Sequence, residues 1–258
     1  MDRRRFAAAM AAGAVVPVVA GAGQAQAEGT GGQEGLRRQM VKALTGALGG
    51  DRAAAEAEVP RILDVCFDWA PPTVEPAKVD FLLAYAFGNR APAGGGDPAK
   101  VRYEPGPVNR ELADTVARIH RRRKVPVYAQ WEIAHFLTDV HGLTDVTSIE
   151  PVVAPDGTIT YLSTYGVAAQ VAAARKGLPG GIGTAGVVGF RDHVKRCVLT
   201  TRLAGIASAG APAGTAMPGT YDPRSGQAWT RSRELYLVHD MAAQWQLLEQ
   251  RLVAAAGA

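Results

Sequence analysis

The stretch Val79-Asp80-Phe81-Leu82-Leu83-Ala84-Tyr85-Ala86-Phe87 decides the fold that this sequence predicts. Apart from Asp80 it is one continuous apolar run, and Gly88 follows it as a turn signal. A strand with one face in water alternates apolar and polar residues, whereas a strand buried on both faces is apolar throughout. We therefore expect a central strand of a parallel sheet over 79–87.

Shorter apolar runs recur along the chain and predict further strands at 125–129, at 185–190 and near 206–207. Segments with apolar residues at helical spacing lie between and after them, at 108–123, 131–140, 164–176, 193–204 and 231–254. Buried strands that alternate with helices predict right-handed crossovers. The expected fold over 79–258 is therefore α/β, a Rossmann-like parallel sheet with helices on both faces. A hairpin is expected around Pro155-Asp156-Gly157.

An N-terminal helical extension is expected before this domain, over 28–78. Residues 28–33 are rich in glycine and predict a linker. Residues 36–48 have the spacing of an amphipathic helix. Asp51 is a suitable N-cap for a second helix, which we expect to be interrupted near Pro60.

The first 27 residues have the three parts of a secretory signal peptide. Arg3-Arg4-Arg5-Phe6 is a basic start, residues 7–23 form a weakly apolar run, and Ala25-Gln26-Ala27 resembles a cleavage site. Paired arginines before a mild apolar run are typical of the twin-arginine route, which exports folded proteins. We therefore expect residues 1–27 to be removed and the mature domain to be extracytoplasmic, either periplasmic or secreted.

The charge of the chain does not indicate a nucleic-acid partner, and its apolar runs do not indicate a membrane span. The net charge of +4 includes the signal's three arginines and its one aspartate, so the mature chain carries about +2. The basic run Arg121-Arg122-Arg123-Lys124 stands at the end of an expected helix, where cations complement the helix dipole. No apolar run after the signal has the roughly 20 residues that a span requires. We therefore expect a soluble mature domain.

Polar side chains follow the expected strands, at the edge where parallel sheets bind ligands. The candidate ligand-binding residues are Asn89, Arg90, Gln130, Glu132, Ser163 and Thr164, and the candidate catalytic residues are His193 and Arg196. The hydroxyls at the start of the helix over 164–176 either cap it or contribute to an anion site. A His and an Arg three residues apart can face the same side of a helical turn.

These residues carry a resemblance to the SanA/YdcF/ElyC-like family of bacterial envelope proteins. The family has a strand that leads into T-S-x-x-H-x-x-R-A, and here Val187-Val188-Gly189 leads to His193 and Arg196. The family's S-T-x-E-N-A motif corresponds to Ser163-Thr164-Tyr165-Gly166-Val167-Ala168. The resemblance covers residues 79–258 and implies a Rossmann-like domain in the envelope, linked to cell-wall or lipid-carrier processes.

The sequence also departs from the family pattern. Gly166 and Val167 replace the Glu-Asn pair, and Gly189 replaces the first Thr of the His motif. The family's S-G-G after the second strand is Gln130-Trp131-Glu132 here. Only Ser163, Thr164, His193 and Arg196 can therefore be carried over from the family.

Other motifs in the sequence give less information about function. The G-x-G-x-x-G spelled by residues 181–186 precedes a strand, whereas a dinucleotide motif follows one. Glu132, His135 and His141 lack a clear fourth ligand, so no metal site is expected. Cys66 and Cys197 could pair after export, but both lie in apolar segments where buried free thiols are common. No motif points to a particular cofactor.

Three functions are consistent with these observations. The first is an enzyme that acts on a small anionic ligand, such as a phosphorylated or lipid-linked cell-wall precursor, with Arg90 and Arg196 holding the anion and His193 as acid or base. The alternative for His193 is a histidine packed at the sheet edge. The second function is a non-catalytic ligand-binding or scaffolding protein of the envelope. The third is a nucleotide-dependent transferase, by analogy of fold alone.

Overall fold

The computed structural model describes residues 25–257, with side chains from residue 32 on. The predicted signal peptide lies outside the described residues up to residue 24. The chain divides between Leu63 and Asp64 into two compact units. Two helices, α1 (Ala25–Ala47) and α2 (Arg52–Cys66), make up most of the first unit, and the sheet and all other elements belong to the second.

The helices α1 and α2 agree in part with the helices predicted from the sequence. Asp51 caps α2 as predicted, since its Oδ1 accepts a hydrogen bond of 2.9 Å from the amide of Ala54. Residues 28–33, predicted as a linker, instead belong to α1. A helix already formed from Leu36 on gains a hydrogen bond with each added residue, so it can extend through poor helix formers. The predicted interruption at Pro60 is also absent, because α2 runs through it. Pro60 removes one backbone donor and crowds the preceding turn, but the helix continues on both sides of it.

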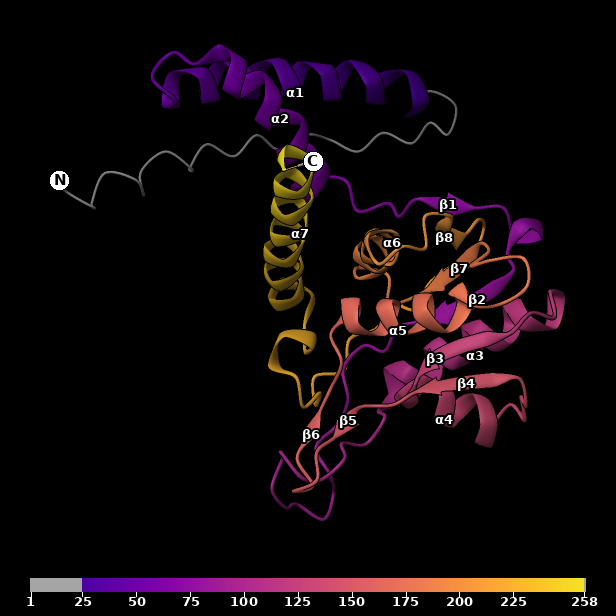
Figure 1. The fold of residues 1–258 in the computed structure, drawn as a ribbon. Helices are drawn as coiled ribbons and strands as arrows, with labels where there is room; N and C mark the ends of the chain where they lie inside the picture. Colours follow the sequence, from indigo (N-terminus) through magenta and orange to yellow (C-terminus); the bar gives the residue numbers. More distant parts are fainter. Residues whose placement is uncertain (1–24, 258) are drawn as a thin grey trace. The chain divides into compact units, whose positions relative to one another are not determined.

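Six parallel strands form the sheet of the second unit, in the order β1-β8-β7-β2-β3-β4 (Figure 1). Their bounds are β1 (Thr73–Val74), β2 (Phe81–Ala84), β3 (Val127–Gln130), β4 (Val146–Ile149), β7 (Ala185–Val188) and β8 (Ala209–Pro212). All four residues of β2 are buried, and Leu83 lies opposite Tyr128 of β3 and Val187 of β7. The predicted Rossmann-like α/β fold is confirmed.

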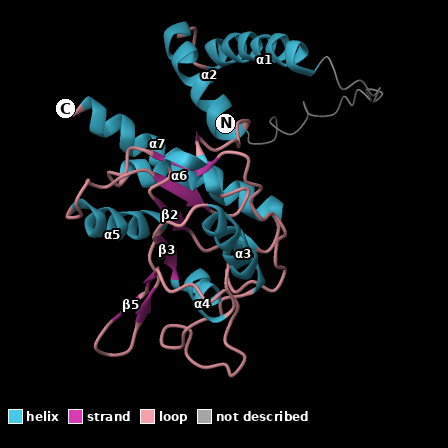
Figure 2. Ribbon diagram, turned by 90° about the vertical axis from the view of Figure 1, so that its right-hand side faces the viewer, coloured by secondary structure: helices cyan, strands magenta, loops and turns pink. Residues whose placement is uncertain are grey.

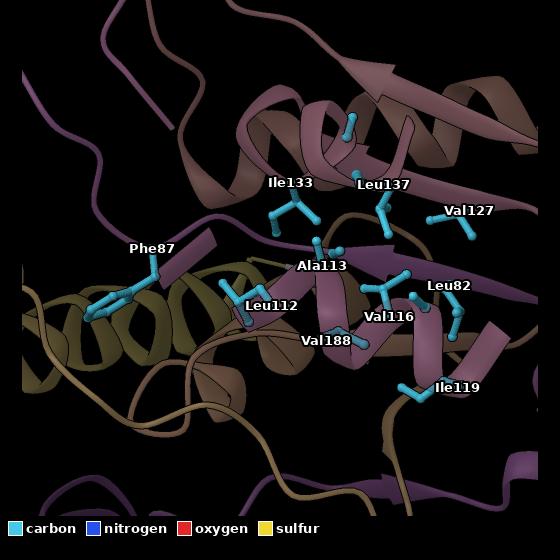
Figure 3. Close-up of a cluster of buried hydrophobic side chains, with 14 of the residues drawn as sticks. Leu82, Phe87, Leu112, Ala113, Val116, Ile119, Val127, Ile133, Leu137 and Val188 are labelled. Atoms are coloured by element: carbon cyan, nitrogen blue, oxygen red, sulfur yellow. The ribbon is translucent and has the colours of Figure 1, made fainter. Parts of the chain in front are cut away.

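The helices cover both faces of the sheet, as Figure 2 shows. One face packs on α3 (Pro107–Arg122) and α4 (Trp131–Asp139), and the other on α5 (Thr164–Lys176) and α6 (Val194–Leu203). Figure 3 shows the first core, in which Leu112 and Val116 of α3 lie with Leu82 of β2 and Val188 of β7. Each such buried side chain contributes about 1.5–3 kcal/mol.

Three strands of the sheet differ from the prediction, since β1 and β4 were not predicted and β8 lies further along the chain than expected. The last core strand, β8, lies at 209–212 and not at 206–207. Ile206 is fully buried, but it closes the end of α6, where its amide donates to the carbonyl of Thr201. Strand β8 consists of small residues because β1 runs close beside it. A Cβ on Gly210 would come within 2.7 Å of the backbone of Thr73.

The edge strand β4 was not predicted, because its two central residues are exposed and polar. The predicted hairpin is present as β5 (Val152–Val153) and β6 (Ile159–Thr160), which pair antiparallel. Two short 3₁₀ helices, η1 (Pro76–Lys78) and η2 (Ala228–Thr230), and the long helix α7 (Arg233–Ala256) complete the unit. Among the described residues, no helix has the length and apolar character needed to cross a membrane.

The order of the strands creates a switch point between β2 and β7. From β2 the chain passes through α3 to β3 on one side, and later returns through α5 to β7 on the other side of β2. The connections that leave β2 and β7 therefore diverge. In open α/β sheets, the crevice beyond the carboxyl ends of such a strand pair is the usual ligand site.

Candidate functional site

A cavity of about 530 Å³ lies at this switch point. The segments that follow β2, β3 and β7 line it, together with the start of α5, η2 and one face of α7. The predicted site residues among its lining are Gln130, Glu132, Ser163, Thr164, His193 and Arg196. Six of the eight residues that the sequence singled out are therefore brought together.

Arg196, on the first turn of α6, is held by three side chains. Its Nε donates to Asp240 Oδ1 over 2.6 Å, its Nη1 to Thr164 Oγ1 over 3.2 Å, and its Nη2 to the hydroxyl of Tyr236 over 3.1 Å. Asp240 is fully buried and also accepts from Tyr236 and from Gln244. Arg196 thus ties α6 to α5 and α7, and the buried carboxylate balances its charge.

Burial of Asp240 acts to raise its pKa, but the contact with His193 and the charge of Arg196 outweigh this and lower the pKa to about 2. The carboxylate is therefore ionised throughout the physiological range. A buried carboxylate that is ionised and fully hydrogen-bonded gives Arg196 a fixed position in the wall of the cavity.

His193 is a neutral imidazole at neutral pH. Its side chain is 7 % exposed, and its Nδ1 lies 3.5 Å from Asp240 Oδ1. Burial, together with the nearby charge of Arg196, lowers the pKa of His193 to about 4. With Nδ1 directed at the carboxylate, Nε2 is the ring nitrogen left for a ligand. Such a histidine can accept a proton at neutral pH, as a general base does.

Glu132, on the first turn of α4, has the opposite shift. The residue is 4 % exposed, and its Oε2 is buried without a hydrogen-bond partner. Burial raises the pKa of Glu132 to about 7, because it disfavours the charged carboxylate. Its neighbour Gln130 has a structural role, since its Oε1 accepts from the amide of Ala86 over 2.9 Å. The cavity therefore holds a neutral base and a carboxylic acid that can donate a proton.

The start of α5 contributes hydrogen-bond donors to the same cavity. Ser163 is its N-cap, and its Oγ accepts from the amide of Gly166 over 3.1 Å. The predicted capping role of Ser163 is thus present. The amides of the first helical turn have no partner within a helix, and the helix dipole makes this end positive. Ser163, Thr164 and Tyr165 all line the cavity, so these donors adjoin it.

Asn89 and Arg90, predicted to bind the ligand, do not line this cavity. Arg90 forms a two-bond ion pair with Asp222, at 2.8 Å from its Nε and 3.2 Å from its Nη2. Its backbone also pairs with Glu104. The loop therefore leaves the cavity after Gly88, and Arg90 anchors it to a segment far along the sequence. Asn89 is buried beside the same loop.

Sequence reasoning missed the residues that α7 supplies. Tyr236 and Asp240 sit one turn apart on the buried face of that helix, followed by Gln244. Polar residues at i, i+4 and i+8 on a face that otherwise meets the core are a usable signal, because buried polar groups need partners. Their partner, Arg196, lies on another helix, so the pattern alone does not name it.

The motifs that the sequence set aside have other partners here. His135 lies 2.9 Å from Asp139 and His141 lies 2.8 Å from Asp114, each through one ring nitrogen. His120 lies 3.1 Å from Asp145. Within residues 25–257, no group of three or more potential metal ligands comes together.

The remaining sequence features are structural. Both cysteines are free thiols, Cys197 being buried and Cys66 half-buried. Gly189 stands where the resembled family has a threonine, and a Cβ there would come within 3.3 Å of Cys197 Sγ and 3.4 Å of the Val194 Cα. The turn after β7 therefore passes close to α6, which brings His193 to the cavity.

Comparisons of this chain with protein-family models, with curated proteins and with solved structures give no match.

Proposed function

We propose that the cavity binds a small phosphate ester and catalyses its hydrolysis by general acid–base chemistry. The observation that carries this proposal is the pair of opposite pKa shifts in one cavity. His193 is neutral above a pH of about 4, and Glu132 keeps its proton up to about 7. Titratable groups whose environments drive their pKa values apart are a usual mark of an acid–base pair.

The proposed roles follow from the position of each group. The first-turn amides of α5 and the hydroxyl of Thr164 hold the phosphate. Asp240 already balances the charge of Arg196, so Arg196 contributes directed N–H groups and little net attraction. His193 takes a proton from a water molecule that attacks phosphorus, and Glu132 gives its proton to the leaving alkoxide. The products are an alcohol and inorganic phosphate.

The test is phosphate release from p-nitrophenyl phosphate and from a panel of sugar phosphates. We expect His193→Gln and Glu132→Gln each to reduce kcat by about 100-fold or more, the usual effect of removing a general acid or base. His135→Gln is the matched control, since His135 is exposed and lies outside the cavity. Equal turnover by all four proteins would overturn the proposed roles.

A non-catalytic ligand-binding protein is the second candidate. It is favoured by Gly166 and Val167, which leave α5 without the Glu-Asn pair of the resembled family. Hydrogen bonds to three side chains also hold Arg196 in one position, as a rigid binding site requires. Stabilisation of the fold by phosphate esters without any phosphate release would support this candidate over the enzyme.

We further propose that the protein acts outside the cytoplasm as a relative of the SanA/YdcF/ElyC-like envelope proteins. The four residues that carry this resemblance, Ser163, Thr164, His193 and Arg196, all line the one cavity. The twin-arginine pattern supports export. Replacement of Arg3 and Arg4 by Lys should leave the precursor inside the cell, as fractionation and immunoblotting would detect. Continued export of that variant would overturn the route.

A further inference from the structure

The cavity is much larger than a phosphate group, and the rest of its lining differs in chemistry from the acid–base end. Six residues that η2, its N-cap and the second half of α7 bring to it carry no charge: Gln227, Trp229, Ala243, Gln246, Leu247 and Gln250. We call these six residues the neutral wall. On α7, the spacing of Ala243, Gln246 and Gln250 places them on one face of the helix, in line with His239.

Trp229 offers one aromatic face to this wall. Its ring is stacked on His239, with centroids 5.2 Å apart and planes inclined by 20°. The residue is nevertheless 42 % exposed, although a large aromatic side chain is usually covered. His239 covers one face and holds the ring in place, so the opposite face is the one available to a ligand.

We infer that the neutral wall binds a sugar ring, so that the ligand of the cavity is a glycosyl phosphate; this rests on the proposed function. A pyranose has one face of C–H groups and a rim of hydroxyls. The C–H face suits the negative face of an aromatic ring. Hydroxyls both donate and accept hydrogen bonds, as do the side-chain amides of Gln227, Gln246 and Gln250.

The same wall suits other ligand classes less well. A nucleobase gains most when aromatic or apolar groups cover both of its faces, and the wall presents the one free face of Trp229. A second charged group on the ligand would find no opposite charge among the six residues. The wall therefore selects a neutral, hydroxylated group beside the phosphate.

The inference is tested by titration calorimetry of the full chain carrying Glu132→Gln, which slows hydrolysis of the probes, with N-acetylglucosamine 1-phosphate, glucose 1-phosphate, AMP and inorganic phosphate. We expect both sugar phosphates to bind about tenfold tighter than inorganic phosphate or AMP, as one stacking contact and one or two hydrogen bonds allow. Trp229→Ala should abolish this advantage and leave the affinity for inorganic phosphate unchanged. Phe67→Ala, which removes an exposed aromatic outside the cavity lining, is the matched control.

The outcomes separate this inference from the proposed function. If inorganic phosphate binds and the sugar adds nothing, or if Trp229→Ala changes nothing, the sugar site is wrong and the phosphate site stands. Equal or tighter binding of AMP would likewise overturn the sugar site. If none of the four probes binds, both proposals fail.

Discussion

The guanidinium Nε of Arg196 lies 2.6 Å from Asp240 Oδ1, and His193 Nδ1 lies 3.5 Å from the same oxygen. One buried carboxylate therefore lies beside both of the residues that the sequence singled out at the start of α6, and it accepts a hydrogen bond from Arg196. Because Asp240 belongs to α7, the C-terminal helix completes the site at the switch point. The stability of the fold and the arrangement of the cavity depend on the same buried contact.

Removal of Asp240 should therefore be costly. We expect Asp240→Ala to lower the free energy of unfolding by about 3–5 kcal/mol, because it leaves the charge of Arg196 buried and unpaired. Chemical denaturation measures this change. Glu249→Gln is the control, an exposed acid on the same helix that should alter stability by less than about 0.5 kcal/mol. A loss as small as the control's would mean that the pair does not hold the helices together.

Glu132 should make stability depend on pH near neutrality. Its pKa is raised from 4.5 to about 7 in the folded protein, so its contribution is fully present below about 4.5 and is lost as the pH rises through 7. The unfolding free energy of the wild type should fall over this window by up to about 3 kcal/mol relative to Glu132→Gln. Denaturation curves of both proteins at several pH values test this. Parallel pH dependences would contradict the raised pKa.

Turnover should have a bell-shaped pH dependence. Activity requires neutral His193, which sets an acid limb near 4, and protonated Glu132, which sets an alkaline limb near 7. The pH profile of kcat/KM for the wild type reports both limbs. In Glu132→Gln the alkaline limb should disappear from the residual activity. A limb that stays near 7 in that variant would assign it to another group.

Arg90 should matter for folding and not for binding. Its guanidinium makes two hydrogen bonds to Asp222, so Arg90→Ala should lower the midpoint of chemical denaturation. Its affinity for inorganic phosphate should stay within about twofold of the wild type, a difference well under 1 kcal/mol. Arg110→Ala removes an exposed arginine from α3 and serves as the control. A large loss of phosphate affinity in Arg90→Ala would show instead that Arg90 contributes to phosphate binding.

Much of the fold could be predicted from local patterns. The apolar runs identify β2, β3 and β7 because a strand buried on both faces is apolar along nearly its whole length. The bounds of α5 agree with the prediction because Ser163 caps it and a basic turn ends it. Strand β8 could not be predicted, since the contact that requires its small residues comes from β1, far away in sequence.

The site could be predicted only where the topology determines it. Residues after β3 and β7 meet at one edge of any parallel sheet, and Glu132 and His193 both line the cavity there. Arg90 has the same relation to β2, but its nearest carboxylate, Asp222, lies in a loop whose path no local pattern specifies. For the same reason Asp240 was missed, because its role depends on how α7 packs.

Amide chemical shifts recorded during a titration with inorganic phosphate show directly whether the switch-point cavity is a phosphate site. We expect the largest ¹H–¹⁵N shift changes at the first-turn amides of α5, those of Thr164 and Tyr165, and we expect them to saturate as the phosphate concentration rises. Changes confined to other surfaces, such as the basic run at 121–124, or no saturable changes at millimolar phosphate, would contradict the proposed phosphate site.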